Sequence, residues 1–287
     1  MDALLGGLGG ELRAATVRDP LGREIDARFA LLAGVGRDPA KPIAVVEVAE
    51  ASGLGRVIEA ERNPEAATTH GTGELIAAAI EAGSRRVLVA AGGSATTDGG
   101  AGAIEAIEEI GGLQDSRLEV LCDVRIPFER AAEVFGPQKG ADPAAVERLS
   151  ERLQARAGAL PRDPRGRPMT GAAGGLSGGL WAAFGARLVP GAAFVLGALG
   201  FDRHLEDADV VITGEGRLDA QSFEGKLVGE IVRRCRGSGA PLHAIVGSNA
   251  LNPASSRRLG LASVQTAGEQ EAIARAAERI AGADVVG

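Results

Sequence analysis

Residues 87–107, VLVAAGGSATTDGGAGAIEAI, decide the fold class, because an apolar run leads through a glycine-rich loop into a helical pattern. The run VLVAA predicts a buried strand, and isoleucines that recur every three residues predict the apolar face of the next helix. The same order of strand, loop and helix recurs along most of the chain. Strands that alternate with helices indicate an α/β fold with a largely parallel sheet.

Apolar spacing and capping residues predict the other elements. Residues 12–32 contain two extended runs around the turn DPLGR, which indicates a β-hairpin and a second, more mixed unit. The pair Asp142-Pro143 marks the start of a helix. Residues 159–170 are rich in proline, arginine and glycine, and they predict a mobile loop that does not pack. The remaining elements are strands at 43–48, 118–122, 208–213 and 242–246, a helix capped by Thr72, and helices at 226–236 and 269–280.

Length and composition exclude several classes of protein. The 287 residues suggest about two domains, and 45% hydrophobic with 24% charged residues is typical of a folded soluble chain. No apolar run is long enough to cross a bilayer and the start lacks a basic region, so we expect a cytoplasmic protein. The net charge of −7 and the absence of tyrosine argue against nucleic acid or a membrane surface as partner. Cys122 and Cys235 lie in apolar surroundings, which predicts buried free thiols.

Glycine and lysine depart most from ordinary usage. The chain has 43 glycines, about twice the usual share of roughly 7%. Its only lysines are Lys41, Lys139 and Lys226. Lys139 and Lys226 stand inside glycine-containing motifs, which indicates that their ammonium groups have a functional role.

The loop GGSATTDGGAG at 92–102 is the first candidate site, because ligands bind beyond the carboxyl ends of parallel strands. Glycines allow close backbone approach, and successive N–H groups with a helix N-terminus bind anions. The hydroxyls of Ser94, Thr96 and Thr97 add donors, and the Asp98 carboxylate suits Mg²⁺ binding or proton acceptance. The loop is not a Walker A motif. The candidate binding residues here are Gly92, Gly93, Ser94 and Thr96.

The second candidate site is TGEGRLDAQSFEGK at 213–226, which is predicted to be a loop after a strand. Mixed charge of this kind suits phosphoryl transfer, in which carboxylates hold a metal ion while lysine and arginine neutralise phosphate oxygens. For either loop the alternative is a tight connection with solvated charges. The candidates are Gly214, Gly216, Arg217 and Ser222 for binding, Glu215 for metal, Asp219 for proton acceptance and Lys226 for charge stabilisation.

Two further positions keep two interpretations open. Lys139, in FGPQKGA before a helix start, is either a charge-stabilising group or a solvated loop lysine. Arg62 either binds a carboxylate or belongs to a surface turn. His204 and His243 are interpreted as structural or exposed residues.

Six motifs in register resemble the type I glycerate kinase family over essentially the whole chain. They are RNPEAATTHGTGELI (62–76), GGSATTDGGAG (92–102), CDV (122–124), FGPQKGA (135–141), TGAAGGLSGGL (170–180) and TGEGRLDAQSFEGK (213–226).

This resemblance implies ATP-dependent, Mg²⁺-dependent phosphorylation of D-glycerate, with the 2-hydroxyl favoured. It also implies two domains: a Rossmann-like domain formed by 1–11 and 190–287, and a mixed α/β domain inserted at 12–189. We expect Asp98 or Asp219 as the base, Lys139 and Lys226 as charge stabilisers, and Glu215 and Asp123 as metal candidates. The expected partners are glycerate and ATP, with a homodimer left open.

The chain departs from the family pattern at several points. Thr97 stands where the family has Asn, His70 where it has Tyr, and Arg125-Ile126 where it has Asp-Asn. Family members usually carry a further N-terminal segment that this sequence lacks. We expect either a start codon assigned too far downstream, which is the favoured explanation, or a truncated homologue. The missing segment keeps open a non-catalytic protein that binds a small organic acid or nucleotide. A kinase for a related hydroxy acid also stays open, because spacing alone does not identify the glycerate contacts.

Overall fold

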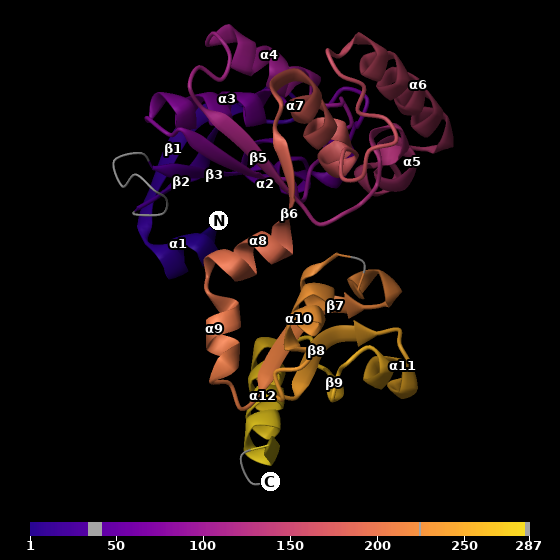
Figure 1. The fold of residues 1–287 in the computed structure, drawn as a ribbon. Helices are drawn as coiled ribbons and strands as arrows, with labels where there is room; N and C mark the ends of the chain where they lie inside the picture. The colour runs from indigo at the N-terminus through magenta and orange to yellow at the C-terminus, as the bar shows by residue number, and fades with distance from the viewer. Residues whose placement is uncertain (34–41, 224, 285–287) are drawn as a thin grey trace. The chain divides into compact units, whose positions relative to one another are not determined.

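Strands and helices alternate to build two sheets, each in its own part of the chain (Figure 1). The computed structural model describes residues 1–33, 42–223 and 225–284. The chain divides into two units, Met1–Gly191 and Ala192–Gly287. The predicted α/β class is confirmed, whereas the grouping of residues 1–11 with 190–287 stays a prediction.

The first unit contains a six-stranded mixed sheet with the strand order β1-β2-β3-β4-β5-β6. β1 to β3 pair antiparallel, which confirms the hairpin, and β3 to β6 pair parallel. The strands are β1 (Gly10–Arg18), β2 (Glu24–Leu32), β3 (Ile43–Glu47), β4 (Arg86–Ala90), β5 (Arg117–Cys122) and β6 (Arg187–Pro190).

Helices α3, α4 and α7 cover one face of this sheet (Figure 1). Apolar side chains such as Leu75, Ile107 and Leu176 from these helices join Val89 and Val120 of the strands in one buried cluster. The helices of the unit are α1 (Asp2–Leu8), α2 (Val48–Ser52), α3 (His70–Glu81), α4 (Ala101–Glu109), α5 (Ala131–Phe135), α6 (Pro143–Ala159) and α7 (Leu176–Phe184).

The two predicted helix starts in this unit differ in outcome. The Asp142 carboxylate accepts a hydrogen bond of 2.7 Å from the Ala145 N–H, so the predicted start of α6 is confirmed. Thr72 does not cap α3, which already begins at His70. The hydroxyl of Thr72 instead donates to Ser52 Oγ at 2.8 Å, within the core.

Two glycine-rich segments, 92–102 and 170–180, pack backbone against backbone. The Gly99 N–H donates to the Gly174 carbonyl at 3.1 Å. A Cβ on Gly174 would collide with the Thr96 carbonyl, and one on Gly179 would collide with the Gly99 carbonyl. Only glycine allows this approach, so the second glycine cluster serves packing.

Phe128 fills the space beside these two segments and is completely buried. A Cβ on either Gly99 or Gly175 would lie 2.8 Å from its ring. The ring also packs with Leu149 and Leu153 of α6. One aromatic side chain therefore joins both glycine-rich segments to α6.

The segment 159–170 was predicted to be a mobile loop that does not pack, and that prediction is wrong about packing. Its backbone is irregular beyond α6, but Pro164 and Thr170 are buried. The Thr170 hydroxyl donates to the Arg167 carbonyl at 2.6 Å, and the Pro164 carbonyl, 2.9 Å away, is its alternative acceptor. Arg167 also lies over the ring of Trp181, with its guanidinium carbon 4.3 Å from the ring centroid. Local hydrogen bonds and a cation–π contact hold this segment in place, although it has no regular secondary structure beyond α6.

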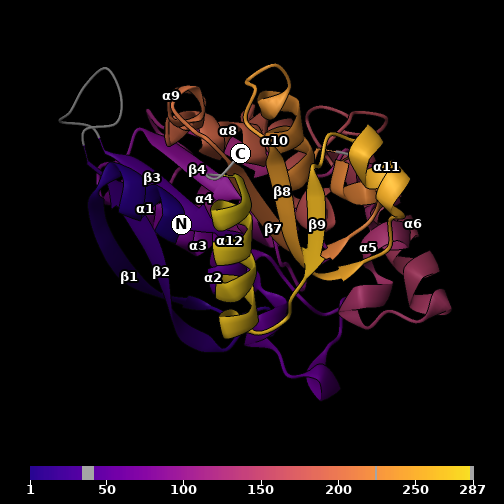
Figure 2. The ribbon, with the colours of Figure 1, turned by 90° about the horizontal axis from the view of Figure 1, so that it is seen from below.

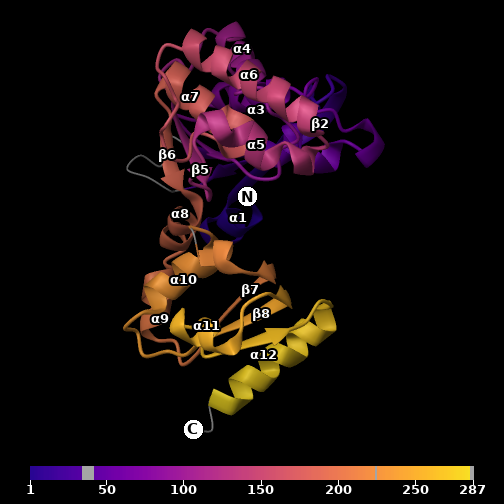
Figure 3. The same cartoon turned by 90° about the vertical axis from the view of Figure 1, so that its right-hand side faces the viewer.

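The second unit contains a three-stranded parallel sheet with the order β7-β8-β9 (Figure 2). α10 packs on one face and α12 on the other (Figure 3). The strands are β7 (Val211–Leu218), β8 (Leu242–Asn249) and β9 (Ser263–Thr266), and the helices are α8 (Gly191–Ala198), α9 (Phe201–Glu206), α10 (Leu227–Cys235), α11 (Pro253–Arg258) and α12 (Gln270–Asp284).

β7 extends further than the sequence predicts. Residues 213–218 were assigned to a loop, but they continue the strand and pair in register with β8 as far as Leu218 opposite Asn249. Glycines at 214 and 216 weaken the strand signal in the sequence. A Cβ on Gly214 would lie 2.5 Å from the Ile245 carbonyl oxygen, so close pairing with β8 requires glycine there.

Both cysteines are buried and free, as predicted. Burial raises the pKa of the Cys122 thiol to about 12, so this side chain stays neutral. Among the described residues, no helix has the length and apolar character needed to cross a bilayer.

The packing of the glycine segments predicts that Gly179→Ala destabilises the first unit by about 1–3 kcal/mol, because the new methyl group meets the fixed backbone carbonyl of Gly99. Urea unfolding followed by tryptophan fluorescence measures this, since Trp181 is the one tryptophan of the chain and lies in this unit.

Gly158→Ala is the matched control, because Gly158 lies in α6 with nothing within 4 Å of its added Cβ. We expect it to stabilise the unit by about 0.5–1 kcal/mol. Equal unfolding midpoints for Gly179→Ala and the wild type would contradict the packing argument.

Candidate functional site

The loop after β4 is held at the carboxyl edge of the six-stranded sheet by the end of α2 and the two residues that follow it. The Leu54 N–H donates to the Gly93 carbonyl at 2.8 Å, and the Ala95 N–H donates to the Ser52 carbonyl at 2.9 Å. These two bonds fix the position of residues 93–95. Gly92 and Gly93 are exposed, whereas Ser94 and Thr96 are buried.

Three successive backbone N–H groups of this loop lack a protein partner in the described part of the chain. The amides of Gly92, Gly93 and Ser94 have no acceptor among the residues that the structure describes. Gly93 has φ +68°, a left-handed conformation of the kind found where successive amides converge on an anion. Residues 92–94, the amide cradle below, thus provide donors without a side-chain charge.

Lys139 lies on the inner side of this loop and is 2% exposed. Its ammonium donates to Ser94 Oγ at 3.0 Å and to the Thr96 carbonyl at 2.6 Å. Burial lowers the pKa of Lys139 to about 8, although the nearby Asp98 carboxylate opposes this shift. The predicted charge-stabilising lysine is thus placed inside the loop rather than in solvent.

Arg62 shares a small cavity with Lys139. The cavity has a volume of about 10 Å³, which is enough for one water molecule. Arg62 Nε is buried and has no hydrogen-bond partner among the described residues. The structure therefore brings these two predicted cationic residues together, beside the loop.

Asp98 is the second charged group that holds the loop. Its Oδ2 accepts from the Thr69 N–H (2.9 Å), the Thr69 hydroxyl (2.8 Å) and the Gly102 N–H (3.2 Å). Its Oδ1 accepts from the Gly100 N–H at 3.0 Å. The carboxylate thus links the loop to the first turns of α3 and α4. Thr69 also accepts from the Ala103 N–H, a role that the sequence analysis missed although Thr69 stands inside the THGTGE run.

Asp123 follows β5 and is exposed, one strand away from the amide cradle. A Cβ on Gly191 would lie 3.0 Å from its Oδ1, so the start of α8 passes close to this carboxylate. Nothing in the geometry assigns a ligand to Asp123, and its role as a metal ligand stays a prediction.

In the second unit, Thr213 and Glu215 lie two residues apart on β7, so their side chains leave the same face of the sheet. The Thr213 hydroxyl and Glu215 Oε1 are buried and lack hydrogen-bond partners within the described part of the chain. Buried oxygens without donors fit a cation. No three His, Cys, Asp or Glu side chains among the described residues are close enough to form a metal site by themselves.

Arg217, near the end of β7, comes together with Asp219 and Ser222, which follow the strand. Arg217 Nε lies 3.5 Å from Asp219 Oδ2. The Asp219 N–H donates to Ser222 Oγ at 3.0 Å, and Ser222 is completely buried, so this serine shapes the turn. Lys226 stands at the N-cap of α10 and is partly exposed.

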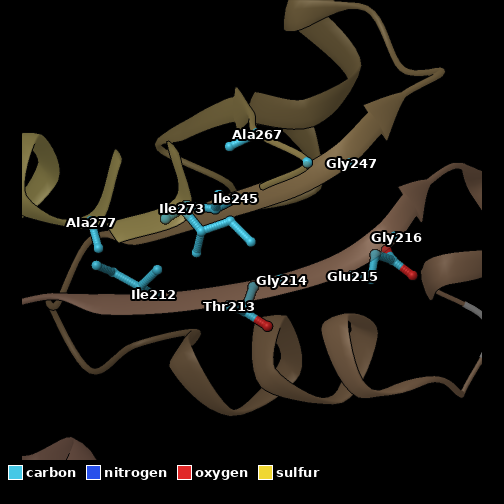
Figure 4. Close-up of a pocket in the computed structure, with 11 residues that line it drawn as sticks. Ile212, Thr213, Gly214, Glu215, Gly216, Ile245, Gly247, Ala267, Ile273 and Ala277 are labelled. Carbon is cyan, nitrogen blue, oxygen red and sulfur yellow. The ribbon is translucent and has the colours of Figure 1, made fainter. Parts of the chain in front are cut away.

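The opposite face of β7 contains a pocket of about 450 Å³ (Figure 4). We call it the sheet-face pocket. Its lining includes the predicted binding residues Gly214 and Gly216, and Ile273 of α12 projects into it (Figure 4). Glu215 is the one charged residue in its lining, which is otherwise apolar apart from Thr213.

Comparisons with known proteins bear on the whole chain. A sequence model described as the glycerate kinase family matches residues 1–110 and 108–284. The chain is 37% identical over 283 residues to a glycerate kinase of Halalkalibacterium halodurans, in a match that covers 86% of this chain and 73% of that protein. It is 35% identical over 283 residues to the glycerate 2-kinase of Escherichia coli K12, with the same coverage of each chain.

A solved structure is also similar. It is the crystal structure of a protein assigned as glycerate kinase 2 from Salmonella typhimurium LT2, and it matches with a TM-score of 0.75 and 34% identity. The match covers 96% of this chain and 81% of that one.

The enclosure of Lys139 predicts a pH-dependent contribution to stability. The pKa of Lys139 is about 8 in the folded chain and ordinarily 10.5. Between pH 8 and pH 10.5 the unfolded chain therefore has more protons bound at this side chain than the folded chain has. Raising the pH from 7 to 9.5 should therefore stabilise the wild type relative to Lys139→Met by about 1–2 kcal/mol.

Urea unfolding of both proteins at the two pH values, followed by Trp181 fluorescence, measures this difference. A difference between wild type and variant that does not change with pH would show that the ammonium is not enclosed as described.

Proposed function

The chain belongs to the glycerate kinase family, and on that premise we propose that it transfers the γ-phosphoryl group of ATP to a hydroxyl of D-glycerate, with the 2-hydroxyl favoured. The observation in the structure that best supports this proposal is the amide cradle, whose three N–H groups have no acceptor within the described residues. Glycerate carries a carboxylate, and backbone amides suit an anion of this kind.

We assign the glycerate carboxylate to the amide cradle. Lys139 and Asp98 act from the inner side of the loop, where they hold Ser94, Thr96 and the first turns of α3 and α4. The cradle is thus preorganised, and binding does not have to order it. Arg62 adds a positive charge beside Lys139.

The nucleotide is assigned to the second unit, where Arg217 and Lys226 supply positive charge for phosphate oxygens. Magnesium, when bound, neutralises charge on those oxygens. Glu215 Oε1 and the Thr213 hydroxyl fit such an ion because both are buried without donors in the described chain. Magnesium sites commonly use one or two carboxylates together with substrate phosphates, so a full set of protein ligands is unnecessary.

We assign the general base to Asp219 rather than Asp98. Oδ2 of Asp98 already accepts three hydrogen bonds and Oδ1 accepts a fourth, which leaves little capacity for a proton from substrate. The Asp219 side chain is 32% exposed and stands next to Arg217. A base within reach of the substrate hydroxyl would accept its proton as the phosphoryl group is transferred.

The direct test is ADP release from ATP by the purified chain in the presence of Mg²⁺ and D-glycerate. We expect turnover with D-glycerate that exceeds turnover with tartronate or lactate, and ³¹P NMR should identify the product as 2-phosphoglycerate.

If the chain releases no ADP but D-glycerate or ADP raises its unfolding temperature, the function is binding without catalysis. Greater turnover with tartronate or lactate would assign it to a related hydroxy acid. The absence of both turnover and stabilisation would contradict the proposal.

The assignment of the base predicts different results for two matched substitutions. Asp219→Asn should lower kcat by about 10²–10⁴-fold with an unchanged unfolding temperature. Asp98→Asn should instead lower the free energy of unfolding by about 1.5–3 kcal/mol, because four donors lose their charged acceptor.

Steady-state kinetics and thermal unfolding of both variants provide the comparison. Loss of turnover in Asp98→Asn at full stability, with Asp219→Asn still active, would reverse the assignment.

A further inference from the structure

A second pocket of the second unit lies beyond the carboxyl ends of β7 and β8. It has a volume of about 310 Å³, and we call it the strand-end pocket. Its lining residues come from the segments that follow the two strands, namely Ala220, Phe223, Leu251, Ser255, Arg258 and Leu259. This is where parallel sheets place their ligands.

The lining combines apolar surface with one cation. Phe223, Leu251 and Leu259 are only partly buried, so apolar surface remains open to a ligand. The Arg258 guanidinium is exposed and donates to Ser255 Oγ at 3.3 Å. No carboxylate of the described residues forms an ion pair with Arg258. A planar cation beside apolar side chains suits a flat aromatic ring.

The same loop leads directly to the charged residues assigned to phosphate. Ala220 follows Asp219, and Phe223 follows Ser222. Lys226 stands three residues beyond Phe223. A ring held in the strand-end pocket would therefore have an anionic tail near these groups. The volume lies at the lower end of the range for small-molecule sites, which suits a base better than a whole nucleotide.

The sheet-face pocket is larger but fits this ligand less well. Its lining contains no cation, and Glu215 is its one charged member. A nucleotide carries negative charge, and this lining offers no side-chain cation to receive its phosphates.

We propose that the strand-end pocket binds the purine base of the nucleotide, with Phe223 and Leu259 as apolar surface and Arg258 over the ring. The use of this nucleotide as a phosphoryl donor rests on the proposed function, whereas its binding does not.

Binding of ADP to the whole chain, measured by isothermal titration calorimetry without glycerate, tests this assignment. Ala220→Phe fills the pocket from an exposed position, and Arg258→Gln removes the cation. We expect each to raise the Kd for ADP and for adenosine at least tenfold, while binding of inorganic tripolyphosphate, which has no base, stays unchanged.

Two substitutions serve as controls. Arg257→Gln removes the neighbouring exposed arginine of α11, which does not line the pocket, and should leave the Kd for ADP unchanged. Ile273→Phe fills the sheet-face pocket instead and should also leave the Kd unchanged. Circular dichroism establishes that each variant is folded.

The outcomes separate this inference from the proposed function. Weaker ADP binding in Ile273→Phe, with no change in Ala220→Phe, would overturn the inference by moving the base to the sheet-face pocket. If the wild type phosphorylates glycerate, and Ala220→Phe and Arg258→Gln bind ADP with the same Kd as the wild type, the inference is overturned while the proposed function stands. ADP binding that both variants weaken, in a chain without turnover, would support the inference and contradict the function.

Discussion

The close packing of two glycine-rich segments is the constraint on which the first unit depends. Residues 92–102 and 170–180 approach so closely that a single methyl group at Gly174 or Gly179 would meet backbone atoms of the other segment. Phe128 then closes the remaining space beside them. The loop at the end of β4 is therefore positioned by main-chain contacts that few other residue types permit. A ligand site on such a loop gains a fixed geometry without depending on mobile side chains.

Two charged side chains complete this arrangement from within. Lys139 and Asp98 both bond to the loop or to the helices beside it, and both therefore act on the side that faces the protein. Burying an ammonium is unfavourable unless polar partners receive it, and Ser94 Oγ and the Thr96 carbonyl do so here. In the proposed site, these side chains therefore hold the loop, and the backbone amides bind the ligand.

The sequence predicts the strong, local features of this fold and misses the features that depend on tertiary contacts. Apolar periodicity predicts the hairpin, the central strands and most long helices, and six motifs in register predict the family, which the comparisons confirm. β6 and β9 have only four residues each, too few for a clear pattern. β7 was assigned too short because its glycines resemble a loop until β8 is present to pair with them. The packing of 159–170 depends on partners such as Trp181 that are distant in sequence.

The sequence likewise predicts some features of the candidate site and misses others. Sequence composition indicates which loops matter, since glycine clusters and rare lysines stand out without any coordinates. It does not indicate which side of a loop each side chain occupies, because that depends on how α2, α3 and the 170–180 segment pack around it. Lys139 was predicted as a charge stabiliser and Asp98 as one of two candidate bases, and these roles stay predictions; the structure adds that both side chains hold the loop. Thr69 was missed because its two partners lie about thirty residues away along the chain.

The enclosure of Lys139 has a consequence for protein chemistry in the laboratory. A chain with three lysines offers few primary amines to acylating reagents, and this one is 2% exposed. A reagent reaches it only when the residues packed around it open, and local opening of this kind has its own free energy, separate from that of global unfolding. The rate of acylation at Lys139, relative to the partly exposed Lys226, thus measures how often the packing around Lys139 opens.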